Sequence, residues 1–351
     1  MVTLKRLMIL AMVICFSIGL LTIFSSDVLA QKKKAKLTLL GAKLGSDAQN
    51  FSQALGDIVT KKHPWIDMSV VESLGAVDNC KTMADMAPNM RKLHVSQSID
   101  PVLAVYTAGV GPFKAIGKQD GWRALFALYN TGTHFMTLDA NIKDPKKDFV
   151  GQKLGLPPKG HGLSKTAEFG LFKCWDLKGK VKPIYMPMGM LKDALMDGTI
   201  DIVVSGGMWL SQNEFKCSPF NEAILASKKT INFIGFTKED FEYGMTKPPF
   251  EPYTFGPVSA NARMEGYPPK DGFGLLRSAF TWYVWEDFDE EMAYELVKTT
   301  AENANLFKEY FAAGKAASVE TLTANVWGPK RFHPGALKYY KEKGIPFQGK
   351  D

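Results

Sequence analysis

Short apolar runs alternate with amphipathic helical patterns along most of this 351-residue chain. Residues 37–40 form one such run, short enough for a strand, and a glycine-containing turn over residues 41–46 follows it. Further on, apolar residues recur at the spacing of one helix face: Phe51, Ala54, Leu55, Ile58 and Val59. Strands that alternate with helices are typical of βα units around a mainly parallel sheet. The sequence therefore predicts the α/β fold class.

The alternation comes in two rounds. The first continues with strands at 68–71 and 93–95, and the turn 73–79 leads into a helix between them. The second begins near residue 133, and its expected elements are strands at 153–156, 181–186 and 200–204 and helices at 164–174 and 190–196. Glycine-bearing loops follow several of these strands, and ligands of such sheets bind outside the carboxyl ends of strands. We therefore expect two lobes with a ligand cleft between them.

Residues 1–30 have the pattern of an export signal. Lys5 and Arg6 precede an apolar run over residues 7–24, and small residues stand at the −3 and −1 positions of a cut after Ala30. This pattern predicts a cleavable signal peptide and a periplasmic mature chain. An uncleaved membrane anchor stays open as an alternative, because the apolar run approaches the length of a bilayer span.

Composition removes several classes of function. The chain has 43 Lys and Arg against 36 Asp and Glu, a net charge of +7 that is too mild to predict a nucleic-acid partner. Its histidines never fall at metal-ligand spacing, and no H-E-x-x-H or G-x-S-x-G motif occurs, so we expect no metal, no cofactor and no hydrolase chemistry. Of the cysteines beyond the signal, Cys174 and Cys217 form a conceivable disulfide, and Cys80 is left over.

Several segments together carry a resemblance to a known family. They are residues 191–201 (LKDALMDGTID) with Ser205-Gly206-Gly207 behind them, residues 266–271 (GYPPKD), residues 109–113 with 122–129, and the closing segment 332–345 (FHPGALKYYKEKGI). In order and spacing, from about residue 37 to 345, they resemble the TAXI solute receptors of tripartite ATP-independent periplasmic (TRAP) transporters.

The resemblance implies a fold, a function and partners. The fold would be a two-lobed, type II periplasmic-binding-protein fold, each lobe a mainly parallel sheet flanked by helices. Lobe 1 would take residues 31–130, lobe 2 residues 131–252, and residues 253–351 would return to lobe 1. The protein would bind a small polar solute, an amino acid or a carboxylate-like molecule, and deliver it to integral-membrane TRAP subunits for ion-gradient-driven uptake. We expect a monomer that is not an enzyme.

The resemblance also places ligand contacts, by position, on loops of both lobes. They are Leu44, Gly45, Ser46, Asp47, Gln49, Gly75, Ala76, Val77, Asp78, Asn79, Gln97, Ser98, Gly160, His161, Gly162, Ser205, Gly206, Gly207 and Trp209. Tyr129 and Asn130 lie where the chain crosses between lobes and are expected to face the cleft. Arg263, on the return to lobe 1, is the residue we expect to clamp a carboxylate.

Asp47 marks a departure from the family. Residues 45–49 read Gly-Ser-Asp-Ala-Gln where the family usually has Gly-Gly-Thr-Tyr-Tyr, so two aromatic ligand walls are missing. A carboxylate at Asp47 would repel an acidic ligand and suit an ammonium or hydroxyl group. Alternatively Asp47 is the N-cap of the helix that contains Phe51. Both interpretations stay open.

For several other residues a structural role is an alternative to contact with a ligand. His161 is either a ligand contact or a solvated loop histidine, and Trp209 either stacks on a solute or packs inside the protein. We expect Arg123 to be structural. Phe280 belongs to an aromatic cluster, with Trp282, Tyr283, Trp285 and Phe288, that we expect in the core.

Two other functions stay open beside the TRAP receptor. One is a periplasmic binding protein that serves an ATP-driven importer or a sensor kinase. The other is a secreted enzyme on the same scaffold, for which Asp47 and His161 are the one pair that could supply a catalytic acid and base.

Overall fold

The computed structural model describes residues 33–217, 224, 226–227, 229–264 and 271–350, so the predicted signal peptide lies outside the described residues. The chain divides into a leading segment that ends at Ala35 and a compact unit, Lys36–Asp351, which is described from here on. Among the helices of the described ranges, none has the length and hydropathy needed to cross a membrane.

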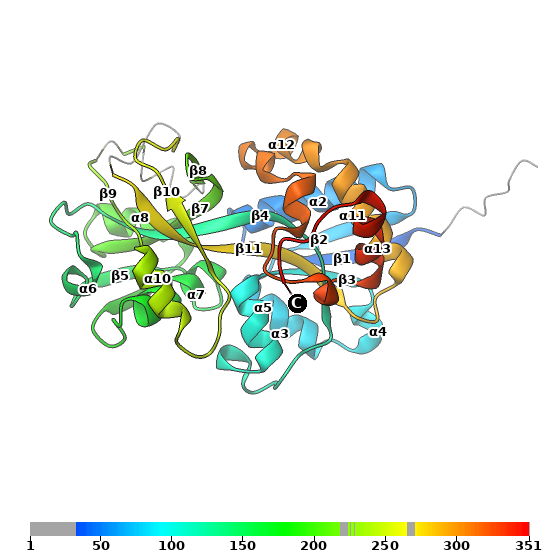
Figure 1. Ribbon diagram of the computed structural model, residues 1–351, viewed down its shortest axis with the longest axis horizontal. Coiled ribbons are helices and arrows are strands. Elements are labelled where there is room, and N and C mark those ends of the chain that lie inside the picture. Colours follow the sequence, from blue (N-terminus) through cyan, green and yellow to red (C-terminus); the bar gives the residue numbers. More distant parts are fainter. Residues whose placement is uncertain (1–32, 218–223, 225, 228, 265–270, 351) are drawn as a thin grey trace, which may run out of the picture. The chain divides into compact units, whose positions relative to one another are not determined.

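A single mixed sheet runs through the whole unit (Figure 1). Its strands, in spatial order, are β2 (Ile66–Val71), β1 (Ala35–Leu40), β3 (His94–Ile99), β11 (Phe273–Trp285), β4 (Trp122–Thr137), β7 (Ile202–Ser211), β5 (Lys153–Leu156) and β6 (Lys182–Tyr185). Three more strands attach to this path: β10 (Thr254–Val258) to β11, β8 (Glu214–Cys217) to β7, and β9 (Asn232–Ile234) to β4.

Helices flank both ends of this sheet. Those of the first half and the carboxyl-terminal third are α2 (Asp47–Lys62), α3 (Ala76–Asp85), α4 (Pro88–Arg91), α5 (Asp100–Ala108), α11 (Glu290–Glu302), α12 (Phe307–Tyr310) and α13 (Pro334–Lys343). Those of the middle are α6 (Pro145–Asp148), α7 (Gly162–Phe169), which continues as a π-helical turn over Gly170–Cys174, α8 (Met188–Met196) and α10 (Lys238–Met245). Short 3-10 turns cover Gly111–Phe113, Ala304–Leu306, Ala312–Ala316, Val319–Thr323 and Pro329–Arg331.

The predicted α/β class is confirmed, and two features of the sheet differ from the sequence-based expectation. Parallel pairing joins β1 to β3 and β5 to β6 and β7, but β11 pairs antiparallel with both β3 and β4, and β4 pairs antiparallel with β7. In addition, Ser205, Gly206 and Gly207 lie inside β7, opposite β4, and not in a loop after the strand. The glycines suggested a turn, whereas in the structure Gly206 lets Leu163 come close to the sheet, because a Cβ added there would lie 3.1 Å from Leu163 Cδ1.

Strands β4 and β11 are the elements that connect the two halves of the sheet. They pair with each other along most of their length, from Leu276 opposite Thr133 to Trp285 opposite Trp122. Nearly every residue of β4 is buried, in agreement with the continuous apolar run over residues 124–129. The boundaries that the sequence predicted for two lobes, near residues 130 and 252, stay a prediction.

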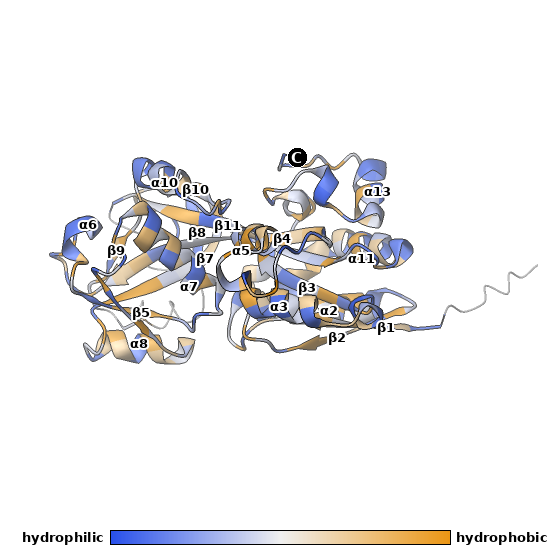
Figure 2. Ribbon diagram, turned by 90° about the horizontal axis from the view of Figure 1, so that it is seen from below, coloured by the Kyte–Doolittle hydropathy of each residue, from blue (hydrophilic) through white to orange (hydrophobic). Residues whose placement is uncertain are grey.

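Separate apolar cores form on the two halves. The larger one includes the predicted face of α2, and there Phe51 stacks on Tyr129 with ring centroids 4.4 Å apart. A second core forms around Phe135, Trp175 and Phe236 on the middle part of the chain. Figure 2 shows strands rich in hydrophobic residues and outer helices such as α11 and α13 that mix hydrophobic with hydrophilic ones.

Individual structural predictions can be checked against these cores. Trp282, Tyr283, Trp285 and Phe288 are buried as expected. Arg123 is structural, since its guanidinium lies 2.6 Å from Glu286. The conceivable bridge between Cys174 and Cys217 is wrong, because Cys174 is a free, buried thiol.

Candidate ligand-binding pocket

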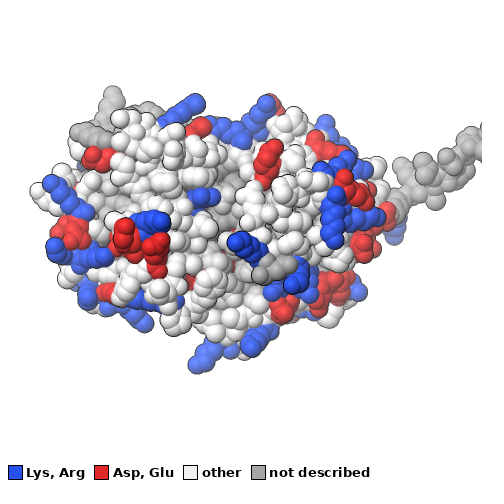
Figure 3. All heavy atoms as spheres, viewed as in Figure 1, with Lys and Arg blue, Asp and Glu red and all other residues white. Residues whose placement is uncertain are grey.

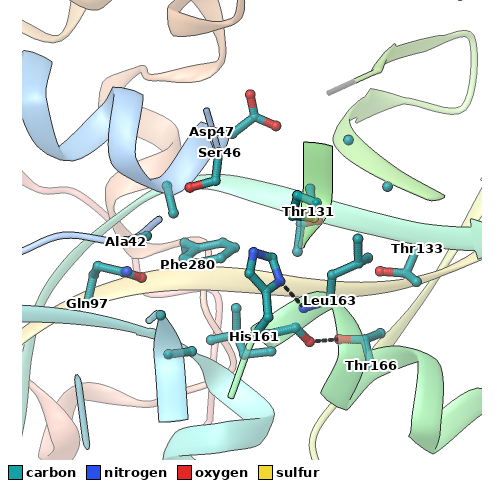
Figure 4. Close-up of a pocket in the computed structure, with 18 of the residues that line it drawn as sticks. Ala42, Ser46, Asp47, Gln97, Thr131, Thr133, His161, Leu163, Thr166 and Phe280 are labelled. Atoms are coloured by element: carbon teal, nitrogen blue, oxygen red, sulfur yellow. Dashed lines mark hydrogen bonds between the residues drawn. The ribbon is translucent and has the colours of Figure 1, made fainter. Parts of the chain in front are cut away.

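A pocket opens where helices α2, α3, α7 and α8 begin, beside strands β4 and β11 (Figure 4). It spans about 680 Å³ when the solvent at its mouth is included. Its lining residues are Ala42, Gly45, Ser46, Asp47, Ala48, Gly75, Ala76, Gln97, Ile99, Tyr129, Thr131, Thr133, His161, Gly162, Leu163, Thr166, Met188, Gly206, Gly207 and Phe280.

The structure brings half of the predicted contact residues together in this one pocket. Those that line it are Gly45, Ser46, Asp47, Gly75, Ala76, Gln97, Tyr129, His161, Gly162, Gly206 and Gly207. Those that do not are Leu44, Gln49, Val77, Asp78, Asn79, Ser98, Asn130, Gly160, Ser205, Trp209 and Arg263. The pocket therefore gathers residues from distant parts of the sequence, and their contact with a ligand stays a prediction.

Some of the residues outside the pocket build its walls. The Ala42 amide donates a 2.7 Å hydrogen bond to Gln49 Oε1, and the Asn79 side chain donates to the backbone oxygens of Gly41 (2.8 Å) and Gln97 (3.0 Å). These bonds hold the loop after β1 against the ends of β3 and α3. Gln49 and Asn79 thus act by positioning backbone.

Trp209 and Arg263 have other surroundings. Trp209 Nε1 donates to the Pro257 backbone oxygen at 3.0 Å, and the Arg277 guanidinium lies 3.7 Å from its ring centre, so Trp209 is packed. The Arg263 side chain is 76% exposed and lies 3.8 Å from Glu214. It is therefore not placed to clamp a carboxylate in the pocket.

Sequence reasoning missed nine lining residues: Ala42, Ala48, Ile99, Thr131, Thr133, Leu163, Thr166, Met188 and Phe280. The sequence predicted ligand contacts mainly on loops, whereas Thr131 and Thr133 lie inside β4 and Phe280 inside β11. Phe280 was expected in the core, and it does stack on Tyr129 with centroids 4.9 Å apart, but it also borders the pocket. The available signal was that Thr131 and Thr133, two residues apart in a strand, share one face of the sheet.

Helix α2 begins at the pocket with a serine cap. Ser46 Oγ accepts a hydrogen bond from the Gln49 amide at 3.3 Å and donates to the Lys43 backbone oxygen at 2.7 Å. The interpretation of Asp47 as the N-cap is therefore wrong, because Ser46 occupies that position and Asp47 is the first helical residue. Figure 4 shows the Asp47 carboxylate turned away from His161. Asp47 lies at the rim of the pocket, where its charge also suits the helix N-terminus.

Helix α7 begins at the pocket with His161 as its N-cap. The Leu163 amide donates to His161 Nδ1 at 3.1 Å, so in the neutral ring the proton is on Nε2. Burial lowers the pKa of His161 to about 4, which keeps the imidazole neutral near pH 7. Figure 4 shows the ring rising from the α7 end into the pocket. His161 is therefore the cap of a helix and borders the pocket, where Nε2–H is available as a donor, and its contact with a ligand stays a prediction.

Helix α3 begins without any side-chain cap. Its N-cap residue is Gly75, at φ +113°, a conformation that favours glycine, and the first-turn amides have no side-chain acceptor. A Cβ added at Gly75 would lie 3.8 Å from the Gly160 oxygen, and one at Gly162 would lie 3.7 Å from the Ala76 Cβ. The starts of α3 and α7 are therefore close neighbours at this site.

Electrostatics at the pocket come from backbone and not from basic side chains. The described lining residues include no Lys or Arg. The helix starts instead direct amide N–H groups and positive dipole ends toward the pocket, an arrangement that favours an anionic group. Two buried polar atoms of the lining, Gln97 Oε1 and Thr133 Oγ1, have no hydrogen-bond partner among the described residues.

A second hollow, beside the turn after α10, has the opposite character. We call it the lysine hollow, and it is lined by Lys165, Glu168, Phe169, Phe172, Lys173, Asp176, Lys178, Lys247, Pro248, Pro249 and Glu251. Glu251 is buried there between Lys165 (3.0 Å) and Lys173 (2.8 Å). Among the described residues, no group of three His, Cys, Asp or Glu side chains could hold a metal ion. Figure 3 shows basic and acidic side chains interspersed on the face it presents, without a large patch of one sign.

Comparison with known proteins agrees with this architecture. Residues 50–344 match the NMT1-like family. The chain belongs to this family. Its fold resembles that of the periplasmic binding protein BugD, with a TM-score of 0.50, 12% identity, and coverage of 90% of this chain and 99% of that one. The fold class of periplasmic binding proteins is thereby confirmed.

Two more solved structures show similarity over most of their length. One is a protein from Bordetella bronchiseptica RB50, with a TM-score of 0.48, 15% identity, and coverage of 90% of this chain and 91% of that one. The other is the periplasmic aliphatic sulphonate binding protein SsuA from Escherichia coli, with a TM-score of 0.42, 10% identity, and coverage of 90% and 96%.

Proposed function

We propose that this protein is a periplasmic receptor that captures a small solute with an anionic group and delivers it to the membrane subunits of a TRAP transporter. The observation that carries the binding role is the pocket where α2, α3, α7 and α8 begin. The first turn of α3 has no side-chain cap, and the Nε2–H of His161 borders the pocket. Helix starts and an N–H donor at one pocket favour a ligand with an anionic acceptor group.

Support for the transporter type comes from the sequence. Residues 191–201 and 332–345 carry the TAXI resemblance, and residues 1–30 have the pattern of an export signal. In the proposed cycle the solute stabilises a closed form of the receptor, which the membrane subunits recognise. The proposed lobes, 31–130 with 253–351 and 131–252, would move relative to each other through strands β4 and β11.

A binding role suits His161 better than a catalytic one. A general base must be able to take up a proton near the working pH, but burial lowers the pKa of His161 to about 4 and its Nδ1 already accepts from Leu163. The Asp47 carboxylate is turned away from this ring. The pair proposed for an enzyme is therefore poorly arranged for proton transfer, which favours the receptor.

A thermal-shift screen tests the binding role. Residues 31–351, unfolded and refolded to remove any co-purified solute, are screened against amino acids, mono- and dicarboxylates, keto acids and amides. A ligand at a hundred times its Kd adds roughly 2.7 kcal/mol, which raises the Tm by a few degrees. If no compound raises the Tm, the proposed binding role is wrong.

A matched pair of variants shows whether binding occurs in this pocket. Thr131→Phe fills the pocket from β4, whereas Thr199→Phe places the same side chain on an exposed turn after α8. The rise in Tm caused by any ligand found in the screen should disappear in Thr131→Phe and persist in Thr199→Phe.

Uptake measurements test the TRAP assignment. In membrane vesicles that contain the cognate membrane subunits, solute uptake with added receptor should stop when an ionophore removes the ion gradient and should not require ATP. Uptake that follows ATP and survives the ionophore would assign the receptor to an ATP-driven importer.

A further inference from the structure

Gln97 presents an unused acceptor to the pocket. Its side chain is fully buried within β3, and its Nε2 donates to the Gly41 backbone oxygen at 2.7 Å, which fixes the orientation of the amide. The other end, Oε1, has no hydrogen-bond partner among the described residues. Figure 4 shows this side chain at the pocket wall opposite Thr133. A buried amide oxygen without a donor is costly, so a ligand that donates to it is favoured.

Gln97 and the donors of the helix starts line the same pocket. Beside Gln97 in β3, Ser98 Oγ donates to the Ala76 oxygen at 3.1 Å, which holds the start of α3 against this strand. A ligand that fills the pocket can therefore reach the first turn of α3, His161 Nε2–H and Gln97 Oε1 together. A carboxylate alone would satisfy the donors but would bring its oxygens close to Oε1. A carboxylate with a hydroxyl or amino group on the adjacent carbon satisfies both.

The rest of the lining limits the ligand to one carboxylate. Its described residues include no Lys or Arg that could neutralise a second anionic group, and Asp47 at the rim adds a negative charge. The remaining walls are largely apolar, with Ile99, Leu163, Met188 and Phe280. Such walls suit an aliphatic or aromatic side chain.

We propose that the solute is a monocarboxylate with a hydroxyl or amino group on the carbon next to the carboxylate and an apolar side chain, and that Gln97 Oε1 selects for that hydroxyl or amino group. This inference rests on the proposed binding function and names the chemical class of its ligand.

Calorimetric titration of the wild-type protein with matched acids tests the ligand class. The pairs are lactate and propionate, α-hydroxyisovalerate and isovalerate, and mandelate and phenylacetate; alanine, valine and phenylglycine carry the amino group, and malate adds a second carboxylate. At least one hydroxy or amino acid should bind roughly tenfold or more tighter than its unsubstituted partner, because a missing donor leaves Oε1 unpaired. Malate should bind more weakly than that acid.

The role of Gln97 is tested by titrating the same pairs of acids into the Gln97→Met variant. This change keeps the length of the side chain and removes both the Oε1 acceptor and the Nε2 donor to the Gly41 oxygen, so the ratio of the affinities for the substituted and unsubstituted acids should fall to about one. The wild-type titrations do not depend on the folding of this variant. A preference that persists in the variant would overturn the role of Gln97.

Other outcomes separate the two proposals. If unsubstituted acids or malate bind as tightly as the substituted monocarboxylates, or if only compounds of another class raise the Tm in the broad screen, the ligand class is wrong and the receptor function stands. If nothing in the broad screen binds, both proposals fail.

Discussion

The pocket and the lysine hollow show two opposite ways of arranging polar groups. The lysine hollow is rich in charge, but its charges neutralise one another: Glu251 lies between Lys165 and Lys173, and Asp176 pairs with Lys247. The pocket contains Asp47 as its one acidic lining residue in the described chain and no Lys or Arg, yet its Gln97 Oε1 and Thr133 Oγ1 have no hydrogen-bond partner among the described residues.

The difference indicates in which of the two sites a ligand would gain more binding free energy. Binding in the lysine hollow would have to replace ion pairs that already exist, whereas binding in the pocket would satisfy two buried oxygen atoms that have no hydrogen-bond partner in the described part of the chain. Abundance of charge is therefore a poor guide to the site here. We therefore expect the lysine hollow to stabilise the fold and the pocket to bind the solute.

Removing the buried carboxylate of the lysine hollow should have the largest effect on stability. Glu251→Gln leaves Lys165 and Lys173 without their counter-charge, and the loss should be about 3 kcal/mol in urea unfolding. Solute affinity should not change. The matched change Glu242→Gln, in an exposed pair with Lys238, should cost less than about 0.5 kcal/mol. An equal effect of the two changes would mean that the hollow is not a structural ion-pair site.

Filling the pocket should have the opposite effects: a large loss of solute affinity and a small loss of stability. Thr131→Phe should weaken solute binding by about a hundredfold, because its ring occupies the space between β4 and the helix starts. The Tm without solute should fall by only a few degrees, since Thr131 is partly accessible. If Thr131→Phe binds the solute with unchanged affinity, the binding site lies elsewhere.

The pH dependence of stability should report the neutral His161. Burial lowers its pKa in the folded protein to about 4, below the ordinary value of 6.5, so the unfolded state binds more protons between these values. Stability should therefore be fully present above about pH 6.5 and fall as the pH is lowered toward 4. His134, buried among aromatic rings with its pKa lowered to about 3, acts in the same direction.

The contribution of His161 can be isolated by substitution. His161→Asn keeps an acceptor for the Leu163 amide and removes the titrating group, so urea unfolding of this variant should show a shallower loss of stability below pH 6.5. An unchanged pH profile would show that the ring is not held neutral in the folded state.

The smallest effects should come from the start of α2. Ser46→Ala removes the N-cap acceptor and should cost about 1 kcal/mol. Asp47→Ala should cost less than about 0.5 kcal/mol, because this residue is not the cap and its charge complements the helix dipole. Urea unfolding of the two variants shows which change costs more stability. A larger loss of stability in Asp47→Ala than in Ser46→Ala would mean that Asp47 is the cap.

Local patterns in the sequence were sufficient to predict much of the fold. The helix face from Phe51 to Val59 and the strands after it follow from apolar spacing, and all are present. The antiparallel centre of the sheet was not predictable in this way, because β4 and β11 are far apart in sequence and their pairing depends on tertiary contacts. Their long buried runs read equally well as separate core segments.

The site was only partly predictable for a related physical reason. Loops with glycine before a helix indicated Ser46, Gly75 and His161, whose helix starts do meet at the pocket. Thr131, Thr133 and Phe280 were missed because they lie on strands, and whether a strand residue faces a core or a cavity depends on what packs above it. Arg263 was misplaced because sequence alone does not show which way a return segment turns its side chain.

The most direct test of the binding site is a crystal structure of the protein with the solute found by titration. The account predicts that its carboxylate lies within hydrogen-bond distance of the first amides of α3 and of His161 Nε2, with a donor of the solute at Gln97 Oε1. A solute bound instead among the ion pairs of the lysine hollow, with the pocket empty, would contradict it.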